Sequence, residues 1–332
     1  MMSRKISRIE RALDALEPLE ASCTLCPREC RVDRRQDKTG ICRSGSRAAL
    51  SSALLHFGEE PVLSGLHDRA ESDPVEETSR RGSGTIFFTG CNLKCLFCQN
   101  YQISWLGQGR EVSDAELAEI MLELQRRGAY NINLVSPTHF LTPILRALRI
   151  ACGRGLKIPL VYNTNGYEKA EIIEKLAGII DIYLPDLKYR SSRVSLRYSA
   201  AEDYFLHAGP AAQEMFLQQP DLILDGDGIA RQGLIIRHLI LPGHADDSLA
   251  VLDWIAQKLP TTTALSLMSQ YRPCHLAPED IRRPLSAEEY RLVVAGARRL
   301  GFENLFIQPE SFRPDEHLLP DFDLPDPFRW KK

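Results

Sequence analysis

The sequence of 332 residues predicts an α/β fold built around a parallel sheet. Two observations predict it. From about residue 82 onward, short apolar runs alternate with segments of helical periodicity, and this strand–helix unit occurs six times before a final apolar run. Parallel strands also need crossover connections of about helix length, which this spacing supplies. The alternation by itself fits a doubly wound sheet and a barrel equally well.

The expected strands are apolar runs with turn-forming residues at their ends, and they cover residues 85–88, 132–135, 158–162, 179–184, 234–241, 264–268 and 304–307. The expected helices between them cover 113–128, 140–152, 168–176, 194–218, 248–259 and 286–301. Two of these helices begin with a capping box, SDAE at 113–116 and SAEE at 286–289. In such a box the serine and the glutamate each satisfy a backbone N–H group of the first turn.

Three regions are expected along the chain. Residues 1–80 form an N-terminal helix and a cysteine-rich metal knuckle, residues 81–310 form the α/β core, and residues 311–332 form an extended tail rich in proline and acid. The formal net charge is −3, so no general attraction to nucleic acid is expected. No apolar run is long enough to span a membrane, and the N-terminus does not resemble a signal peptide. We expect a cytoplasmic protein.

The chain has nine cysteines, and seven of them fall into two clusters. An odd count in a chain of this length does not suggest a secreted disulfide framework. Clustered thiols in a cytoplasmic protein more often bind metal.

The second cluster, CNLKCLFCQNY, directly follows the first expected strand and contains Cys91, Cys95 and Cys98. A cubane iron–sulfur cluster usually has four thiolate ligands. Three thiolates leave one iron open to a further ligand, such as the amino and carboxylate groups of a cofactor. The alternative is zinc with a fourth ligand from elsewhere, although zinc sites favour paired Cys-x2-Cys knuckles.

Polar side chains follow nearly every expected strand of the core. Any one of them could be an ordinary turn or cap residue. The carboxyl ends of parallel strands share one rim, where α/β barrels carry their active sites, so their joint placement suggests a site. The residues concerned are Ser136, Thr138, His139, Asn163 to Gly166, Asp186, Lys188, Tyr189, Arg237, His238, His244 and Ser269 to Tyr271.

The motifs together carry a resemblance to a known family. GSGTIFFTGCNLKCLFCQN, NINLVSPTHF, VYNTNGY, DIYLPDLKY and RHLILPG resemble the radical S-adenosylmethionine (SAM) superfamily, in the branch related to pyruvate formate-lyase activating enzyme. The resemblance extends roughly from Cys23 to Gly301.

This resemblance implies a partial (β/α)6 barrel and an oxidoreductase activity. Cys91, Cys95 and Cys98 would hold a [4Fe–4S] cluster whose fourth iron binds SAM. One electron, from a low-potential donor such as flavodoxin or ferredoxin, would cleave SAM to a 5′-deoxyadenosyl radical. That radical would abstract a hydrogen atom from a substrate.

The resemblance also implies roles for other residues. Lys188 and Asp186 match an active-site motif of the activating enzymes, and Thr164 to Gly166 match a turn near the cofactor ribose. The expected cofactor site comprises Ser136, Thr138, Asn163, Asn165, Gly166 and Arg237.

The chain departs from the family in two places. SPTH replaces the Gly-Gly-Glu stretch that often follows the second strand, and no ferredoxin-like insert follows Cys98. These departures leave activation of a glycyl-radical enzyme open. It is still the leading expected reaction, with modification of a peptide or small molecule next. The protein or small-molecule substrate itself stays open.

The first cysteine cluster is spaced Cys23-x2-Cys26-x3-Cys30-x11-Cys42. This spacing matches neither a standard zinc knuckle nor a standard ferredoxin run. Zinc or another structural metal, a second iron–sulfur cluster, and unbound thiols all remain open.

Glu59 and Glu60 lie between the two cysteine clusters and are expected as solvated acids on a surface loop, with a role at the active-site mouth as the alternative. Two other functions compete with radical chemistry. One is an iron–sulfur electron carrier or redox sensor without turnover, and the other is a zinc-braced binding module.

Overall fold

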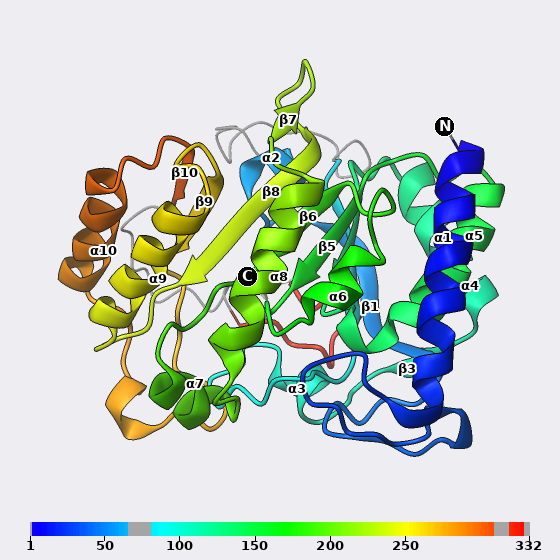
Figure 1. Cartoon of the computed structure of the whole chain (residues 1–332), viewed down its shortest axis with the longest axis horizontal. Helices are drawn as coiled ribbons and strands as arrows, with labels where there is room; N and C mark the ends of the chain where they lie inside the picture. Colours follow the sequence, from blue (N-terminus) through cyan, green and yellow to red (C-terminus); the bar gives the residue numbers. More distant parts are fainter. Residues whose placement is uncertain (1, 66–80, 309–318, 329–332) are drawn as a thin grey trace.

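The structure, a computed structural model, describes residues 2–65, 81–308 and 319–328 (Figure 1). The strands form one sheet in the order β10-β9-β8-β6-β5-β4-β2-β1-β3, with β7 paired to β8. Their bounds are β1 Ala48–His56, β2 Ser83–Phe88, β3 Arg110–Val112, β4 Ile132–Val135, β5 Leu160–Thr164, β6 Ile182–Pro185, β7 Ile223–Leu224, β8 Ala230–Leu239, β9 Ala264–Met268 and β10 Leu305–Ile307. All neighbours from β2 to β10 along this order pair in parallel.

Most of the longer helices lie on the outer face of this curved sheet (Figure 1). Their bounds are α1 Met2–Leu16, α2 Pro61–Ser64, α3 Tyr101–Ser104, α4 Asp114–Arg126, α5 Leu141–Gly153, α6 Ala170–Glu174, α7 Ser192–Ser199, α8 Tyr204–Gln218, α9 Ala245–Lys258 and α10 Ala287–Arg299. Among the described residues the edge strands β3 and β10 do not pair with each other. The predicted partial barrel is therefore confirmed.

The side chains of each strand alternate between two apolar layers, as the period of a β-strand requires. Ile86 and Phe88 of β2 point outward into the large core shared with the helices. The inner layer contains Val161, Leu184 and Ile235, and α2 fills it with Val62 and Leu63. The short helix α2 thus closes the barrel at the amino-terminal ends of the strands.

Most expected elements are present, with shifts at their ends. β4 and β9 have the expected bounds, and both capping boxes form at Ser113 and Ser286. The expected long helix over 194–218 is two helices, because Ala200 takes a left-handed conformation (φ 51°) and ends α7. A residue in this conformation commonly terminates a helix.

Strand β1 has no counterpart in the expected elements. It pairs antiparallel with β2 and with β3, so the N-terminal region contributes directly to the sheet. The connection from β1 to β2 is long and includes α2. The two-residue turn that marks a hairpin in sequence is therefore absent between them.

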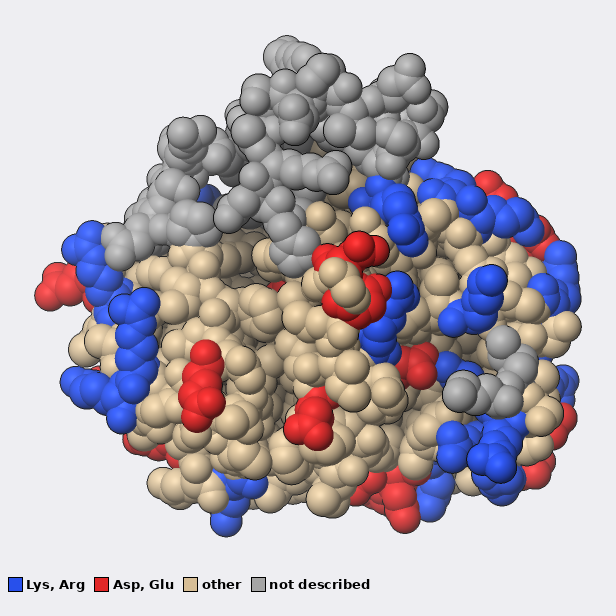
Figure 2. Space-filling model, turned by 90° about the horizontal axis from the view of Figure 1, so that it is seen from above, with Lys and Arg blue, Asp and Glu red and all other residues tan. Residues whose placement is uncertain are grey.

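The molecular surface shows both signs of charge. Lys, Arg, Asp and Glu side chains are scattered over the described part of the face seen in Figure 2. No helix within the described ranges is long and apolar enough to cross a membrane.

Candidate active site

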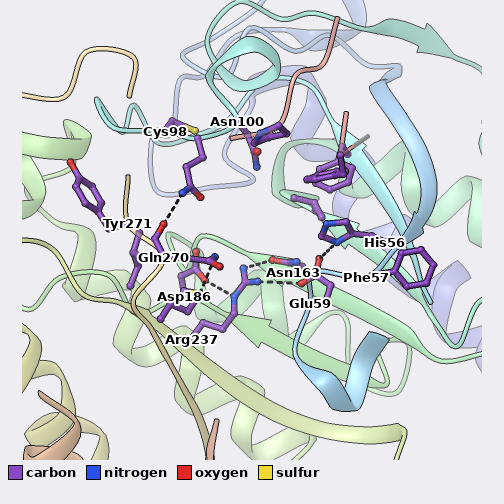
Figure 3. A pocket seen from close by; sticks show the side chains of 18 of the residues that line it. His56, Phe57, Glu59, Cys98, Asn100, Asn163, Asp186, Arg237, Gln270 and Tyr271 are labelled. Atoms are coloured by element: carbon purple, nitrogen blue, oxygen red, sulfur yellow. Dashed lines mark hydrogen bonds and ion pairs between the residues drawn. The ribbon is translucent and has the colours of Figure 1, made fainter. Parts of the chain in front are cut away.

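A cavity of about 480 Å³ lies at the carboxyl ends of the parallel strands (Figure 3). Its wall contains Cys95 and Cys98 from the cluster loop, which we define as residues 91–98. Its floor is polar, with Asn163, Asp186 and Arg237 from three neighbouring strands or strand ends. Phe87, Phe97 and Tyr271 supply apolar surface around these groups. The cavity therefore joins three features: thiols, fixed charges and a partly dry wall.

The cluster loop begins where β2 ends and is held by backbone hydrogen bonds. Gly90 precedes it with φ 73°, and a Cβ at that position would collide with the carbonyl oxygen of Cys42. The loop N–H groups of Lys94 and Leu96 donate to the carbonyls of Ser199 (3.2 Å) and Tyr198 (2.9 Å). Two features thus set the position of the thiols: Gly90, which no other residue could replace without a collision, and the backbone at the end of α7.

Each sulfur of the cluster loop has a hydrogen-bond partner. The amide of Asn165 donates to Cys91 Sγ at 3.2 Å, and the hydroxyl of Ser199 donates to Cys95 Sγ at 3.0 Å. Cys98 Sγ lies 3.2 Å from the hydroxyl of Ser104. Hydrogen bonds to sulfur tune the potential of iron–sulfur clusters and orient their ligands. This donor set fits three cluster thiolates.

Burial raises the pKa of Cys91 to about 11 and that of Cys98 to about 12. A bound metal is therefore needed to keep these groups as thiolates. Among the described residues, no three His, Cys, Asp or Glu side chains converge on one metal ion. In a cubane each cysteine binds a different iron, so its ligands lie further apart than those of a single ion. The arrangement is compatible with a cluster, and no single-ion site of the zinc type is found among the described residues.

Arg237 organises the cavity floor (Figure 3). Its Nε donates to Asp186 Oδ1 at 2.8 Å, and its Nη2 donates to Asn163 Oδ1 at 2.6 Å. Lys188 Nζ donates to the other oxygen of Asp186 at 2.6 Å. Burial alone would raise the pKa of Asp186, but the charges of Arg237 and Lys188 outweigh burial and hold this pKa below its usual range. Asp186 is therefore an anion between two cations.

Glu59 and Glu60 do not lie on the surface, so that expectation is wrong. The side chain of Glu59 is only 7% exposed, and Glu60 is buried. Glu59 lines the cavity and lies 3.3 Å from His56 Nδ1 and 3.5 Å from Arg237 Nη1 (Figure 3). Both residues directly precede α2, which carries them into the barrel with Val62 and Leu63.

The expected catalytic and cofactor residues divide into two groups. Asn163, Asp186, Lys188 and Arg237 lie together in the lining of the cavity. Ser136, Thr138, Asn165 and Gly166 lie outside that lining, near the strand ends behind it. Ser136 has φ 57° and donates its N–H to the Asn163 carbonyl at 2.8 Å. At Gly166 (φ 82°) a Cβ would collide with the carbonyl oxygen of Asp186.

Glu168 joins this second group and was not expected from the sequence. Its Oε1 accepts hydrogen bonds from the hydroxyls of Thr138 (2.5 Å), Thr164 and Tyr162 (3.3 Å). Burial raises the pKa of Glu168 to about 7. The only sequence signal was indirect: two buried threonines at adjacent strand ends need a shared acceptor. Glu168 thus fixes the ends of β4 and β5 relative to each other.

Residues 319–328, which we call the strap, cover part of the cavity. Pro320, Asp326 and Phe328 belong to its lining, and the ring of Phe328 lies 5.4 Å from that of Phe87. Gln102 of α3 donates to the carboxylates of Asp321 and Asp323. The expected extended tail starts at 311, and its residues 311–318 and 329–332 lie outside the described residues.

Comparisons with known proteins place the chain in a family. The Radical SAM superfamily matches residues 85–201, which contain the whole cluster loop and Lys188. The uncharacterized protein MJ0674 of Methanocaldococcus jannaschii is 31% identical over 297 residues, covering 86% of this chain and 77% of that protein. The chain belongs to the radical SAM superfamily. A second protein of that organism, MJ0808, is 26% identical over 170 residues, covering 49% of this chain and 48% of that protein.

Two solved structures are also similar in fold. SuiB of Streptococcus suis, bound to the precursor peptide SuiA, matches with a TM-score of 0.45 and 12% identity over 67% of this chain. The protein anSMEcpe, with bound AdoMet and the Cp18Cys peptide, matches with a TM-score of 0.43 and 14% identity over 64% of this chain. The chain spans about half the length of these two structures, 47% and 56% respectively.

Proposed function

We propose that this radical SAM protein is an oxidoreductase that cleaves SAM reductively and abstracts hydrogen from a substrate. The observation that carries the proposal is a loop of three hydrogen-bonded thiols, two of which, Cys95 and Cys98, line a cavity with a charged floor. Cys91, Cys95 and Cys98 would hold the [4Fe–4S] cluster. When bound, the cluster and SAM supply a one-electron cleavage and a 5′-deoxyadenosyl radical.

The residues of the chain would bind the cofactor and orient it in the cavity. The side chain of Lys188 is 15% exposed and uses one hydrogen-bond donor on Asp186, whereas an ammonium group has three donors. Its remaining donors suit the carboxylate of an amino-acid cofactor. Asp186 in turn fixes Lys188 and Arg237, so that the two cations keep their positions when the cavity fills. Pre-organised charges of this kind cost no reorganisation at the moment of reaction.

Other side chains exclude water from the cavity. Phe97 is 5% exposed, lies within the cluster loop and packs against Tyr271 with ring centroids 5.5 Å apart. Phe87 and Met268 add apolar wall from the sheet. A dry wall protects a reactive radical from side reactions.

The substrate is proposed at class level. Activation of a partner glycyl-radical enzyme is the leading candidate, followed by a peptide or small molecule. A low-potential protein such as flavodoxin or ferredoxin would supply the electron. An electron carrier without turnover is the second candidate function. The iron–sulfur ligands, considered without the cavity, would also suit a carrier. The cavity beside Cys95 and Cys98 argues against it, because a carrier needs no substrate space.

The test is anaerobic. The protein is reconstituted with iron and sulfide, reduced and mixed with SAM, and 5′-deoxyadenosine is quantified. We expect formation by the unaltered chain and its loss in the Cys91→Ala/Cys95→Ala/Cys98→Ala variant. Cys274→Ala is the matched control, because Cys274 contacts the Phe97 carbonyl at 3.3 Å without belonging to the three ligands. It should retain formation.

Two results would contradict the proposal. The first is equal 5′-deoxyadenosine formation in the triple variant, which would remove the three cysteines from the reaction. The second is a reduced cluster whose electron paramagnetic resonance (EPR) spectrum does not change when SAM is added. That second result would favour the electron-carrier function.

A further inference from the structure

The four N-terminal cysteines surround one small cavity on the other side of the cluster loop. Cys23, Cys26, Cys30 and Cys42 all line it, together with Arg28, Arg34, Asn92 and His139. We propose that these four cysteines hold a second [4Fe–4S] cluster in which every iron has a cysteine ligand. We call the four residues the cysteine quartet. The proposal concerns a site separate from the three cysteines of the cluster loop.

The chain around the quartet is not held by regular structure. Between Cys23 and Arg47 the described elements are limited to one short 3-10 helix, Arg34–Gln36. Glu29, Arg31 and Arg43, each next to a quartet cysteine, have φ values of 39°, 54° and 57°. Such left-handed conformations are unfavourable for residues other than glycine, and they persist only where the surroundings impose them. A metal centre bound by four side chains supplies that constraint.

Arg34 indicates the charge that the cavity should contain. It is only 1% exposed, and its Nε and Nη2 donate to the carbonyls of Ser44 (3.3 Å) and Gly45 (2.5 Å). Its Nη1 is buried with no partner among the described residues. A buried guanidinium group without an anion is costly. Four thiolates around a metal centre carry net negative charge and would provide the missing counter-ion.

Backbone N–H groups close to the quartet sulfurs support the same conclusion. The backbone N–H groups of Leu25 and Arg28 face the sulfur atoms of Cys23 and Cys26. Each donor lies two residues after its cysteine, so the chain turns around the sulfur. Backbone donors of this kind stabilise a thiolate ligand.

The quartet resembles the cluster loop in its arrangement more than it resembles a site for a single zinc ion. Zinc at about 2.3 Å from each sulfur would draw all four thiols together around one point. The quartet cysteines share a cavity, yet within the described ranges no three of them converge on one ion. The three cysteines of the cluster loop behave in the same way. Ligands that bind separate irons of a cubane are expected to stand apart in this manner.

The two sites are in contact through the chain. Asn92, which follows the ligand Cys91, lines the quartet cavity, and its carbonyl accepts a hydrogen bond from Arg28 Nε at 2.8 Å. Asn165 donates both to the Asn92 side chain (2.8 Å) and to Cys91 Sγ (3.2 Å). Figure 1 shows the N-terminal coil and the segment of α3 at the same end of the sheet. A cluster in the quartet would therefore lie directly behind the cluster loop.

The decisive experiment uses the full chain with Cys91→Ala, Cys95→Ala and Cys98→Ala, which leaves the quartet intact. After anaerobic reconstitution we expect about four iron and four sulfide per chain in this variant, and about twice these values in the unaltered protein. The reduced variant should give an EPR signal that SAM does not change, since its cluster has no open iron. Zinc, counted by mass spectrometry, should be substoichiometric.

A second variant, Cys30→Ser/Cys42→Ser, changes the two less buried members of the quartet. It should lose about half of the iron and keep the signal that responds to SAM. Absence of iron from the triple alanine variant would overturn the proposal, and so would about one tightly held zinc per chain in that variant. If the serine variant does not fold, the triple alanine variant still decides, because its quartet is unaltered.

Discussion

Glu168 shows how one buried carboxyl group can connect two strand ends. Three hydroxyl groups donate to its Oε1, whereas its Oε2 is buried without a partner among the described residues. A carboxylate in this position would leave charge on an oxygen that receives no hydrogen bond. The protonated form avoids that cost, which agrees with a pKa raised to about 7 by burial.

Replacement of Glu168 by Gln should change how stability depends on pH. The folded protein holds this proton with a pKa of about 7, against 4.5 for the same group in an unfolded chain. The stabilisation is complete below the lower pKa and is lost as pH rises through the higher one. Relative to wild type, Glu168→Gln should therefore gain roughly 2–3 kcal/mol in unfolding free energy between about pH 5 and pH 8.

Urea unfolding across this pH range measures the effect of Glu168→Gln. Glu174→Gln is the control, because the side chain of Glu174 is 61% exposed and its substitution should leave the pH profile of wild type intact. Parallel profiles for Glu168→Gln and wild type would contradict the assignment of a buried, protonated acid.

The residues of the site differ in how far the sequence predicts them. The three cluster-loop cysteines and the pair Asp186 and Lys188 follow from local motifs, and the structure places Cys95, Cys98 and that pair at one cavity. Glu59 was expected on the surface because its neighbours, Gly58 and Glu60, are typical of a loop. Its burial depends on α2 entering the barrel, a long-range contact that no short motif encodes.

At the scale of elements, capping explains why α10 begins where it does. Glu289 accepts hydrogen bonds from the N–H groups of Ser286 (2.9 Å) and Gly243 (2.6 Å). It also forms two hydrogen bonds with the guanidinium group of Arg283, at 2.6 and 2.8 Å. These bonds, that of Arg283 first, hold the pKa of Glu289 far below its usual range. One carboxylate thus fixes the helix start and the loop after β8.

Glu289→Gln should lower the unfolding free energy by about 1–2 kcal/mol at neutral pH, because charge-assisted hydrogen bonds are lost. A lowered folded pKa gives stability that is present above the unfolded value of 4.5 and lost as pH falls toward the folded value. The difference from wild type should therefore shrink in acid. Glu116→Gln in the other capping box is the comparison, and denaturation followed by circular dichroism measures both.

Within the described residues, Glu116 accepts no hydrogen bond from the backbone of another element. Its ion pair with Arg110 joins two exposed side chains, with Nη1 and Oε1 3.5 Å apart. Its substitution should cost less than that of Glu289. Equal losses in the two variants would show that the contacts of Glu289 with Gly243 and Arg283 add nothing to the capping box.

Elements with local signals were predicted well, and elements without them were missed. Both capping boxes and the strands β4 and β9 are visible in the sequence because their patterns are complete within a few residues. β1 was missed because its partner β2 lies far along the chain and much of β1 is only partly buried. A strand of this kind is defined by its partner.

At the scale of the whole molecule, the strap brings the end of the described chain to the cavity. Phe322 is 8% exposed and packs against Phe87 with ring centroids 5.6 Å apart. Phe322 and Phe328 join a small apolar cluster with Phe87 and Ile103, and hydrogen bonds from Gln102 and Gln108 hold the acidic residues of the strap. This cluster is separate from the main core, so we expect that the strap can detach without unfolding of the barrel.

Phe322→Ala should therefore accelerate proteolytic cleavage within 319–328 while lowering global stability by less than the roughly 3–5 kcal/mol typical of a core Phe→Ala substitution. Phe302→Ala is the control, because Phe302 is 6% exposed and belongs to the main core. It should show the full loss without selective cleavage of the strap. Limited proteolysis with mass spectrometry, together with urea unfolding, separates the two outcomes. An equal global loss in both variants would contradict a detachable strap.

The position of α2 at one end of the barrel affects where small molecules can enter and leave. Val62 and Leu63 occupy the inner layer of the barrel at the end of the sheet opposite the cluster loop. For the described part of the chain, exchange with solvent is thus left to the end where the strap and the cluster loop lie. A cofactor and a substrate that both occupy this cavity would therefore share one entrance.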